Sequence, residues 1–281
     1  MSEKIVLLDG AVGTSLWEKT ENKVPVWRYN IENPAIVTEL NSEYAEAGAQ
    51  IILANTFGAN GGAVAHSPYT VDQVVTAGVR LAKQAVGGRA KIALAVGPLT
   101  GLLEPYGDIT ADQARALFEE QMSAGMKESP DLICIQTFID LEMMKIAARV
   151  AGGFGVPVFC TMSFEPVGKT MMGNSVQDMV EGLKDCRVDA IGLNCSLGPD
   201  TAVPIIRTFR QCTDLPLIFK PNAGKPTFVD GQPRMSFDIE TFVKDSLPAL
   251  DCGVSCMGGC CGTNAAYIRR LGQRLRELGR L

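Results

Sequence analysis

Leu-Ile-Cys-Ile-Gln-Thr-Phe-Ile-Asp-Leu-Glu-Met-Met-Lys-Ile-Ala-Ala-Arg-Val, at residues 132–150, contains the two patterns that decide the fold. Its first part, Leu132–Phe138, is a short and largely apolar run of the kind found in strands of a buried parallel sheet. Met143, Ile146 and Val150 then recur at the spacing that places apolar side chains on one face of a helix. We therefore expect a buried strand followed by a helix that packs on it.

The same alternation of a strand-like run and a helical pattern occurs eight times along the 281 residues. The strand-like runs are Ile5–Asp9, Ile51–Phe57, Ile92–Pro98, Leu132–Phe138, Val156–Phe164, Ala190–Cys195, Leu215–Pro221 and Val254–Gly259. Eight strand–helix repeats without a linker predict one domain, residues 1–281, folded as a single (β/α)8 (TIM) barrel. A doubly wound open sheet is the alternative that this pattern leaves open.

Two helix starts are marked by capping boxes. Thr70 is followed three residues later by Gln73, and Thr110 is followed in the same way by Gln113. In such a pair the threonine hydroxyl accepts from the third helical N–H, and the glutamine reaches back to the threonine N–H. We therefore expect helices to begin directly after Thr70 and Thr110.

Composition excludes several classes of function. The formal net charge is −5, and Lys and Arg are scattered, so nothing indicates nucleic-acid binding. No apolar run approaches the roughly 18 residues that a membrane-spanning helix needs. The N-terminal residues lead directly into a strand-like run, so we expect no signal peptide. Nine cysteines spread along a chain of this size favour a reducing, cytoplasmic environment over a disulfide framework.

The cysteines at two strand ends are the strongest chemical signal. Cys260 and Cys261 are adjacent in the glycine-rich stretch 258–263, and Cys195 lies 65 residues upstream in Gly-Leu-Asn-Cys-Ser. In a barrel these residues follow the sixth and eighth strands, whose carboxyl ends share one rim. Three thiolates would leave one position of a tetrahedral zinc ion open, which suits a substrate that is itself a thiol. The alternative is three buried, inert thiols, which is how we interpret the other six cysteines.

Polar residues at other strand ends complete a candidate substrate site. Asp9 ends the first strand-like run, where its carboxylate could hold an ammonium group or serve only an ordinary turn. Phe57 ends the second run and could cover a substrate or pack in the core. The remaining candidates are Gly10 and Ala11, whose amides could receive a carboxylate, Asn55 and Thr56 beside Phe57, and Gln136 after the fourth run. The single histidine, His66, excludes a Ser-His-Asp triad elsewhere and a histidine-rich metal site.

Five motifs carry a resemblance to a known family. They are LLDGAVGT (7–14), ANTFGAN (54–60), GLNCSLGP (192–199), KPNAGKP (220–226) and GGCCGT (258–263). From about residue 5 to residue 279 the chain resembles the homocysteine S-methyltransferase domain, most closely the homocysteine-binding module of cobalamin-dependent methionine synthase. The resemblance implies a zinc-dependent barrel that methylates the sulfur of homocysteine to give methionine. It matches Cys195, Cys260 and Cys261 to the zinc ligands of the family.

The resemblance also assigns the substrate contacts. Asp9 matches the acidic residue beside the amino-acid head group, the amides of Gly10 and Ala11 lie where the substrate carboxylate binds, and Asn194 would support the zinc site. At Gln136, members of the family usually carry glutamate, which helps to hold the substrate ammonium. Loss of that charge would weaken homocysteine binding roughly 5- to 30-fold. Either Asp9 compensates, or the acceptor is a thiol without an ammonium group at that place.

The implied mechanism needs zinc but no general base. Zinc would hold the acceptor as a thiolate, and the surrounding sulfur ligands would keep it electron-rich for attack on an activated methyl group. The chain ends just after its last helical pattern, so we expect no cobalamin or folate module in it and a separate corrinoid protein as methyl donor. Alternative donors are S-methylmethionine, S-adenosylmethionine or a betaine. A hypothesis of another class is a zinc- and thiol-binding redox sensor without turnover.

Overall fold

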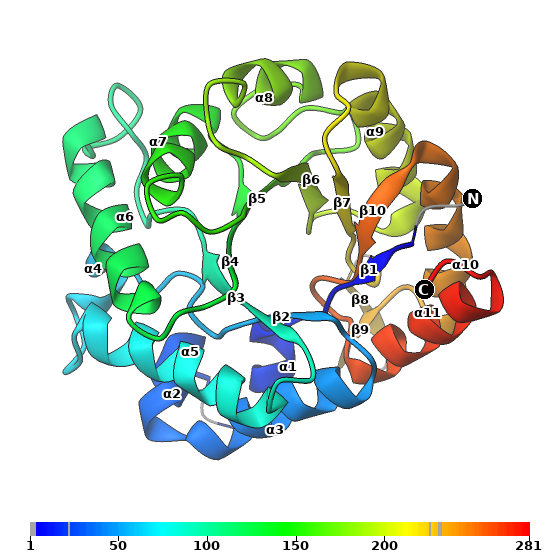
Figure 1. The fold of residues 1–281 in the computed structure, drawn as a ribbon, viewed down its shortest axis with the longest axis horizontal. Helices are drawn as coiled ribbons and strands as arrows, with labels where there is room; N and C mark the ends of the chain where they lie inside the picture. Colours follow the sequence, from blue (N-terminus) through cyan, green and yellow to red (C-terminus); the bar gives the residue numbers. More distant parts are fainter. Residues whose placement is uncertain (1–3, 22, 225, 230–231) are drawn as a thin grey trace.

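The structure, a computed structural model, describes residues 4–21, 23–224, 226–229 and 232–281. Eight parallel strands form one sheet in the order β1-β10-β7-β6-β5-β4-β3-β2 (Figure 1). Their bounds are β1 Val6–Leu7, β2 Ile51–Leu53, β3 Lys91–Val96, β4 Leu132–Phe138, β5 Val158–Met162, β6 Ala190–Asn194, β7 Leu217–Lys220 and β10 Val254–Met257. A parallel bridge between Leu8 and Ile51 joins the two end strands. The predicted (β/α)8 barrel is therefore confirmed, and the open sheet is excluded.

Helices surround the strands as an outer ring (Figure 1). The longer ones are α3 Pro34–Glu46, α5 Val71–Val86, α6 Ala111–Met126, α7 Leu141–Ala151, α9 Pro199–Cys212 and α11 Ala265–Glu277. The shorter ones are α1 Gly13–Glu18, η1 Val26–Arg28, α2 Tyr29–Glu32, α4 Gly61–Val64, α8 Val176–Gly182, α10 Ile239–Ser246 and η2 Leu247–Cys252. The capping boxes predicted at Thr70 and Thr110 are both confirmed. Within the described part of the chain, no helix combines the length and apolarity needed to cross a bilayer.

Apolar side chains form two separate layers. The larger core lies between strands and helices and includes Phe118, Phe138 and Phe209. A smaller cluster fills the inside of the barrel. It contains Leu8 and Cys134, together with side chains from other strands that are more than nine-tenths buried. Filling of the interior by strand side chains makes the barrel a packed core and leaves its carboxyl-end rim for function.

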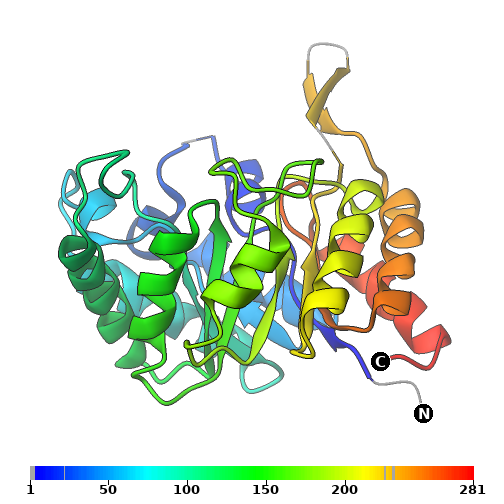
Figure 2. The ribbon, with the colours of Figure 1, turned by 90° about the horizontal axis from the view of Figure 1, so that it is seen from above.

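The structure has a two-stranded hairpin at the rim that the sequence did not predict. Strands β8 (Pro226–Val229) and β9 (Gln232–Met235) pair in an antiparallel hairpin between β7 and α10. Figure 2 shows this hairpin projecting beyond the carboxyl-end rim of the barrel. Two of its eight residues are prolines, and the segment has no regular alternation of apolar and polar residues, so no strand was expected there.

The close approach of β6 and β7 depends on Gly192. A methyl group on its Cα would clash with the carbonyl oxygen of Ile218, which is backbone and cannot turn away. We expect Gly192→Ala to lower the free energy of unfolding by about 3 kcal/mol, measured by urea denaturation. Gly13→Ala is the control, because nothing lies within 4 Å of its added Cβ. An unchanged midpoint for Gly192→Ala would contradict this spacing of the two strands.

Candidate metal centre

Three cysteine side chains meet at the rim. Cys195 directly follows β6, and Cys260 and Cys261 follow β10. Their Sγ atoms all lie within 4.8 Å of one another, and those of Cys195 and Cys261 are 3.6 Å apart. Two sulfurs on one tetrahedral zinc ion, each bound at about 2.3 Å, lie about 3.8 Å apart. The spacing of the three sulfurs therefore fits one zinc ion, and no other group of potential ligands is found among the described residues.

The chain turns sharply at Cys195. Both Cys195 and Ser196 adopt left-handed backbone conformations, with φ of 65° and 60°. Such conformations cost non-glycine residues about 1–2 kcal/mol each, so the surrounding structure must hold them. The Cys195 N–H donates to the Lys220 carbonyl at 3.1 Å, and the Leu197 N–H donates to the Cys195 carbonyl at 2.7 Å. These bonds fix the turn that brings Cys195 towards the other two cysteines.

Asn194 lies directly behind the cysteine cluster and is fully buried. Its Oδ1 accepts from the Thr137 N–H at 2.8 Å and from the Thr161 hydroxyl at 2.7 Å. Its Nδ2 donates to the Thr137 hydroxyl at 2.7 Å and to Cys260 Sγ at 3.6 Å. A donor held in this way orients the sulfur and stabilises negative charge on it.

The three thiols hold their protons strongly in the absence of a cation. The pKa of Cys260 is raised to about 12 by its hydrogen bond with Cys195 and by burial. The pKa of Cys261 is also raised to about 12: its hydrogen bond with Cys195 lowers the pKa, but its hydrogen bond with Cys260 and burial raise it. The pKa of Cys195 is raised to about 11: its hydrogen bond with Cys260 lowers the pKa, but its hydrogen bond with Cys261 and burial raise it. Thiolate is the form that binds metal, so a soft cation must displace these protons.

A cavity of about 250 Å³ opens beside the three cysteines, all of which line it. Five of the substrate residues predicted from the sequence also line it, namely Gly10, Ala11, Asn55, Phe57 and Gln136. The predicted residues Asp9, Thr56 and Asn194 lie outside its lining. Trp17, Thr137 and Lys220 line the cavity but were not singled out in the sequence.

Thr56 and Asn55 tie the loop after β2 to its neighbours. The Thr56 hydroxyl donates to the Ala95 carbonyl at 2.7 Å and accepts from the Ala95 N–H at 3.1 Å. Asn55 Nδ2 donates to Asn30 Oδ1 and to the Val26 carbonyl, both at 2.8 Å. These bonds hold the chain that carries Phe57, whose ring packs against Gly97 so closely that a Cβ there would overlap it.

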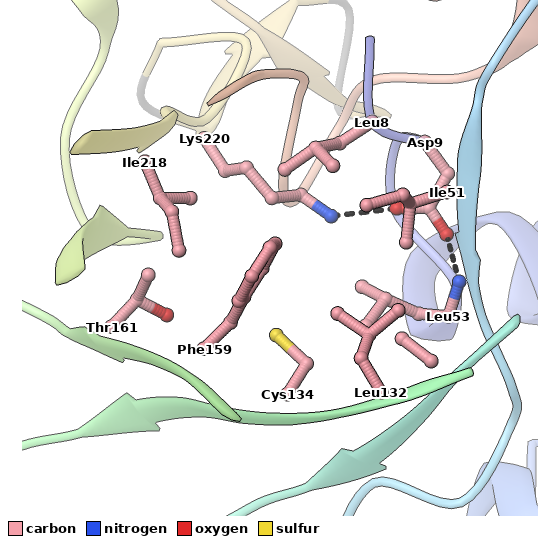
Figure 3. Close-up of a pocket in the computed structure, with 11 residues that line it drawn as sticks. Leu8, Asp9, Ile51, Leu53, Leu132, Cys134, Phe159, Thr161, Ile218 and Lys220 are labelled. Atoms are coloured by element: carbon pink, nitrogen blue, oxygen red, sulfur yellow. Dashed lines mark hydrogen bonds and ion pairs between the residues drawn. The ribbon is translucent and has the colours of Figure 1, made fainter. Parts of the chain in front are cut away.

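Asp9 is buried in an ion pair. Its Oδ1 accepts from Lys220 Nζ at 2.6 Å, and its Oδ2 accepts from the Leu53 N–H at 2.7 Å (Figure 3). Burial alone would lower the pKa of Lys220, but the charge and the hydrogen bond of Asp9 raise it. Both carboxylate oxygens therefore have partners within the protein. A lysine at the end of an apolar strand-like run was the signal in the sequence that could have indicated this pair.

The amide of Ala11 also has a partner within the protein. It donates to the Thr263 hydroxyl at 3.2 Å, while the Ala11 carbonyl accepts from the Tyr44 hydroxyl at 2.6 Å. Gly10 is confined by the same two side chains, since a Cβ on it would lie 2.8 Å from both hydroxyl oxygens. The turn after β1 is thus fixed against α3 and the loop that carries Cys260 and Cys261.

The bonds of Asn194 lead to a prediction for metal affinity. We expect Asn194→Ala to weaken zinc binding about 10- to 100-fold, because Cys260 loses the donor that orients it. Competition with a chromogenic chelator measures this affinity. Asn41→Ala is the matched control, since Asn41 is equally buried but lies on α3 outside the cavity lining. Equal zinc affinity for both variants would mean that Asn194 supports the fold alone.

Known proteins resemble this chain along nearly its whole length. The sequence profile of the homocysteine S-methyltransferase family matches residues 6–275. The chain is 26% identical over 305 residues to methionine synthase of Mycobacterium tuberculosis, which covers 100% of this chain and 25% of that protein. It is 24% identical over 296 residues to methionine synthase of Mycobacterium leprae, covering 96% of this chain and 24% of that protein.

The fold has a close counterpart among solved structures. The metallated form of the homocysteine methyltransferase MmuM of Escherichia coli superimposes with a TM-score of 0.82 at 20% identity, covering 97% of this chain and 96% of that one. The chain spans about a quarter of the length of the methionine synthases that it matches. The family profile, in contrast, covers nearly the whole chain. The chain therefore belongs to the homocysteine S-methyltransferase family, a family of methyltransferase enzymes.

Proposed function

We propose that this protein is a zinc-dependent S-methyltransferase that methylates a small thiol. The observation that carries the proposal is the meeting of three cysteine sulfurs at the edge of a cavity on the carboxyl-end rim. Zinc held there by Cys195, Cys260 and Cys261 would supply the positive charge that makes an incoming thiol ionise at neutral pH. A purely structural zinc site would need a fourth protein ligand, and the described residues place no fourth cysteine, histidine or carboxylate in the cluster.

The residues of the chain have separate tasks in this scheme. Cys195, Cys260 and Cys261 hold the metal, and Asn194 orients Cys260 through its Nδ2. Phe57 gives the cavity an apolar side, which reduces access of water to the reacting sulfur. No side chain is needed to remove a proton during methyl transfer, because an ionised thiol attacks the methyl carbon directly.

The acceptor of the family, homocysteine, is the first thiol to test. For the methyl donor we propose a separate methylated corrinoid protein, supported by the likeness to methionine synthase. S-methylmethionine, S-adenosylmethionine and a betaine are the alternative donors. All nine cysteines are free thiols in the structure, which supports a reducing compartment such as the cytoplasm.

Methyl transfer by the zinc-loaded protein tests this proposal. Homocysteine and other small thiols are mixed with methylcobalamin or a methylated corrinoid protein, and the thioether is measured by mass spectrometry. We expect a methylated product that requires both protein and zinc. Turnover only with a sulfonium or betaine donor would mean that such a small molecule, and not a corrinoid protein, supplies the methyl group. Zinc and thiol binding without methyl transfer from any donor would favour a redox sensor, in which Cys195 and Cys261, 3.6 Å apart, could form a disulfide.

A further inference from the structure

Strand β4 contains a bulge at the cavity. Its register with β5 shifts after Ile135, so that Gln136 and Thr137 lie together opposite Thr161. In a regular strand, neighbouring side chains point to opposite faces of the sheet. Here Gln136 and Thr137 are both half-buried, and both line the rim cavity beside the three cysteines. The bulge therefore turns two consecutive residues of β4 towards the place where a thiol would bind.

The backbone of the bulge is strained at Thr137. Its φ is 65°, a left-handed conformation that is rare for a β-branched residue. Such a conformation persists only where the surrounding structure holds it. Two hydrogen bonds with one side chain do so. The Thr137 N–H donates to Asn194 Oδ1 at 2.8 Å, and the Thr137 hydroxyl accepts from Asn194 Nδ2 at 2.7 Å.

The same side chain reaches the metal centre. Asn194 ends β6, and its Oδ1 accepts from the Thr161 hydroxyl of β5 at 2.7 Å. Its Nδ2 also donates to Cys260 Sγ at 3.6 Å. Asn194 is fully buried, so its amide cannot turn away from one partner without breaking its bonds with the others. One amide group therefore fixes both the position of a metal ligand and the conformation of the β4 bulge.

Gln136 is the residue that the bulge presents to the cavity. Its amide has one acceptor oxygen and two N–H donors, so it can bond either charged group of an amino acid. Gln136 and the three cysteines border the same cavity of about 250 Å³. A small thiol bound through its sulfur at the cysteines extends the rest of its structure into that cavity, where Gln136 meets it.

We propose that Thr137 is a positioning residue that aims Gln136 at the amino-acid head group of the acceptor, and that Asn194 couples this contact to the metal centre. The inference rests on the proposed thiol methylation and assigns the residues that select its acceptor. The reaction itself is unchanged. Because such coupling is reciprocal, loss of the Asn194 bonds weakens both metal binding and recognition of the head group.

Isothermal titration calorimetry of the zinc-loaded protein with homocysteine and with propane-1-thiol tests this inference. Both thiols bind through sulfur, but only homocysteine carries the amino-acid head group, so the ratio of the two affinities measures head-group recognition. We expect wild type to favour homocysteine at least about tenfold. A ratio near one would overturn the inference and leave thiol methylation intact. If neither thiol binds, the proposed function fails, and the inference fails with it.

The hydroxyl of Thr137 supplies the second test. Thr137→Val removes this hydroxyl but keeps the shape of the side chain, and it should lower the affinity ratio about tenfold by weakening homocysteine alone. Thr137→Ser retains the hydroxyl and should restore the ratio. Thr76→Val is the matched control, because the hydroxyl of partly buried Thr76 bonds to the Ala124 carbonyl outside the cavity lining. An unchanged ratio in Thr137→Val, or one that Thr137→Ser does not restore, would contradict the role of Thr137.

A double-mutant cycle tests whether Thr137 acts through Gln136. Gln136→Ala removes the proposed contact itself, so its affinity ratio should fall to near one. Adding Thr137→Val to Gln136→Ala should then change the ratio less than about twofold, because no aimed side chain remains. A further tenfold loss in the double variant would mean that Thr137 acts on the acceptor without Gln136, which the inference excludes.

Asn194→Ala tests the link to the metal. Measured at zinc concentrations that saturate the protein, this variant should lower the affinity ratio about tenfold in addition to its weaker zinc binding. Asn41→Ala again serves as the control and should keep the wild-type ratio, because Asn41 lies outside the cavity lining. If Asn194→Ala weakened zinc binding but kept the wild-type ratio, the bulge and the metal centre would be independent.

Discussion

Replacing any one of Cys195, Cys260 and Cys261 by serine should weaken zinc binding and lower methyl transfer by more than about a hundredfold. Mutation of a residue that only supports a metal ligand already lowers metal affinity or activity about 10- to 100-fold, and loss of a ligand should cost more. The three sulfurs lie within 4.8 Å of one another, so each variant removes a third of the ligands. A serine hydroxyl is shorter and is not ionised at neutral pH, so it does not replace a thiolate as a ligand of a soft cation.

Zinc content by elemental analysis and methyl transfer by product mass check this expectation. Cys212→Ser is the matched control, because Cys212 is also partly buried but ends α9 and lies outside the cavity lining. The control should keep wild-type zinc content and activity. If Cys260→Ser bound zinc as tightly as Cys212→Ser, the cluster would not be the metal site.

Neutralising only one member of the Asp9–Lys220 pair should cost about 3–5 kcal/mol of unfolding free energy. The pair is almost completely buried, with side-chain exposures of 0% for Asp9 and 4% for Lys220. Lys220→Met leaves the carboxylate of Asp9 without a cation, and Asp9→Asn leaves the ammonium of Lys220 without an anion. In both variants an uncompensated charge remains inside the barrel, where water cannot solvate it.

Urea denaturation of the single and double variants separates this penalty from the net value of the pair. Asp9→Asn combined with Lys220→Gln should lie within about 2 kcal/mol of wild type, because neither charge then remains unpaired. Glu240→Gln is the control for an exposed pair with Arg270 and should leave the denaturation midpoint close to that of wild type, because water already solvates both charges. Single variants as stable as this control would show that the buried pair is not needed for stability.

The sequence was sufficient for the architecture because the barrel is built from repeated local patterns. Each apolar run, such as Leu132–Phe138, became a strand, although most of the strands are shorter than predicted. The capping boxes at Thr70 and Thr110 were equally reliable, since their hydrogen bonds lie within four residues. Cys195, Cys260 and Cys261 came together because barrel geometry places the ends of β6 and β10 on one rim.

The remaining features depend on contacts between distant residues. Asp9 and Lys220 are 211 positions apart, and nothing local to either shows that they pair inside the barrel. The sequence left two roles open for Asp9, a ligand for an ammonium group or part of an ordinary turn, and it did not indicate that both carboxylate oxygens have partners in the fold. Thr56 was likewise expected at the substrate, but its hydroxyl bonds to the backbone of β3. Which way a side chain points at the end of a strand therefore depends on its partners in distant parts of the chain, and the local motif does not show it.

X-ray absorption at the zinc edge tests the central claim most directly, because it reports which atoms surround the metal. The protein is measured as isolated with zinc, and again after addition of a small thiol. The account predicts three sulfur neighbours at about 2.3 Å with one lighter neighbour, and four sulfur neighbours after the thiol is added. A zinc ion with four protein ligands whose spectrum does not change on addition of thiols, or a protein that binds no zinc, would contradict it.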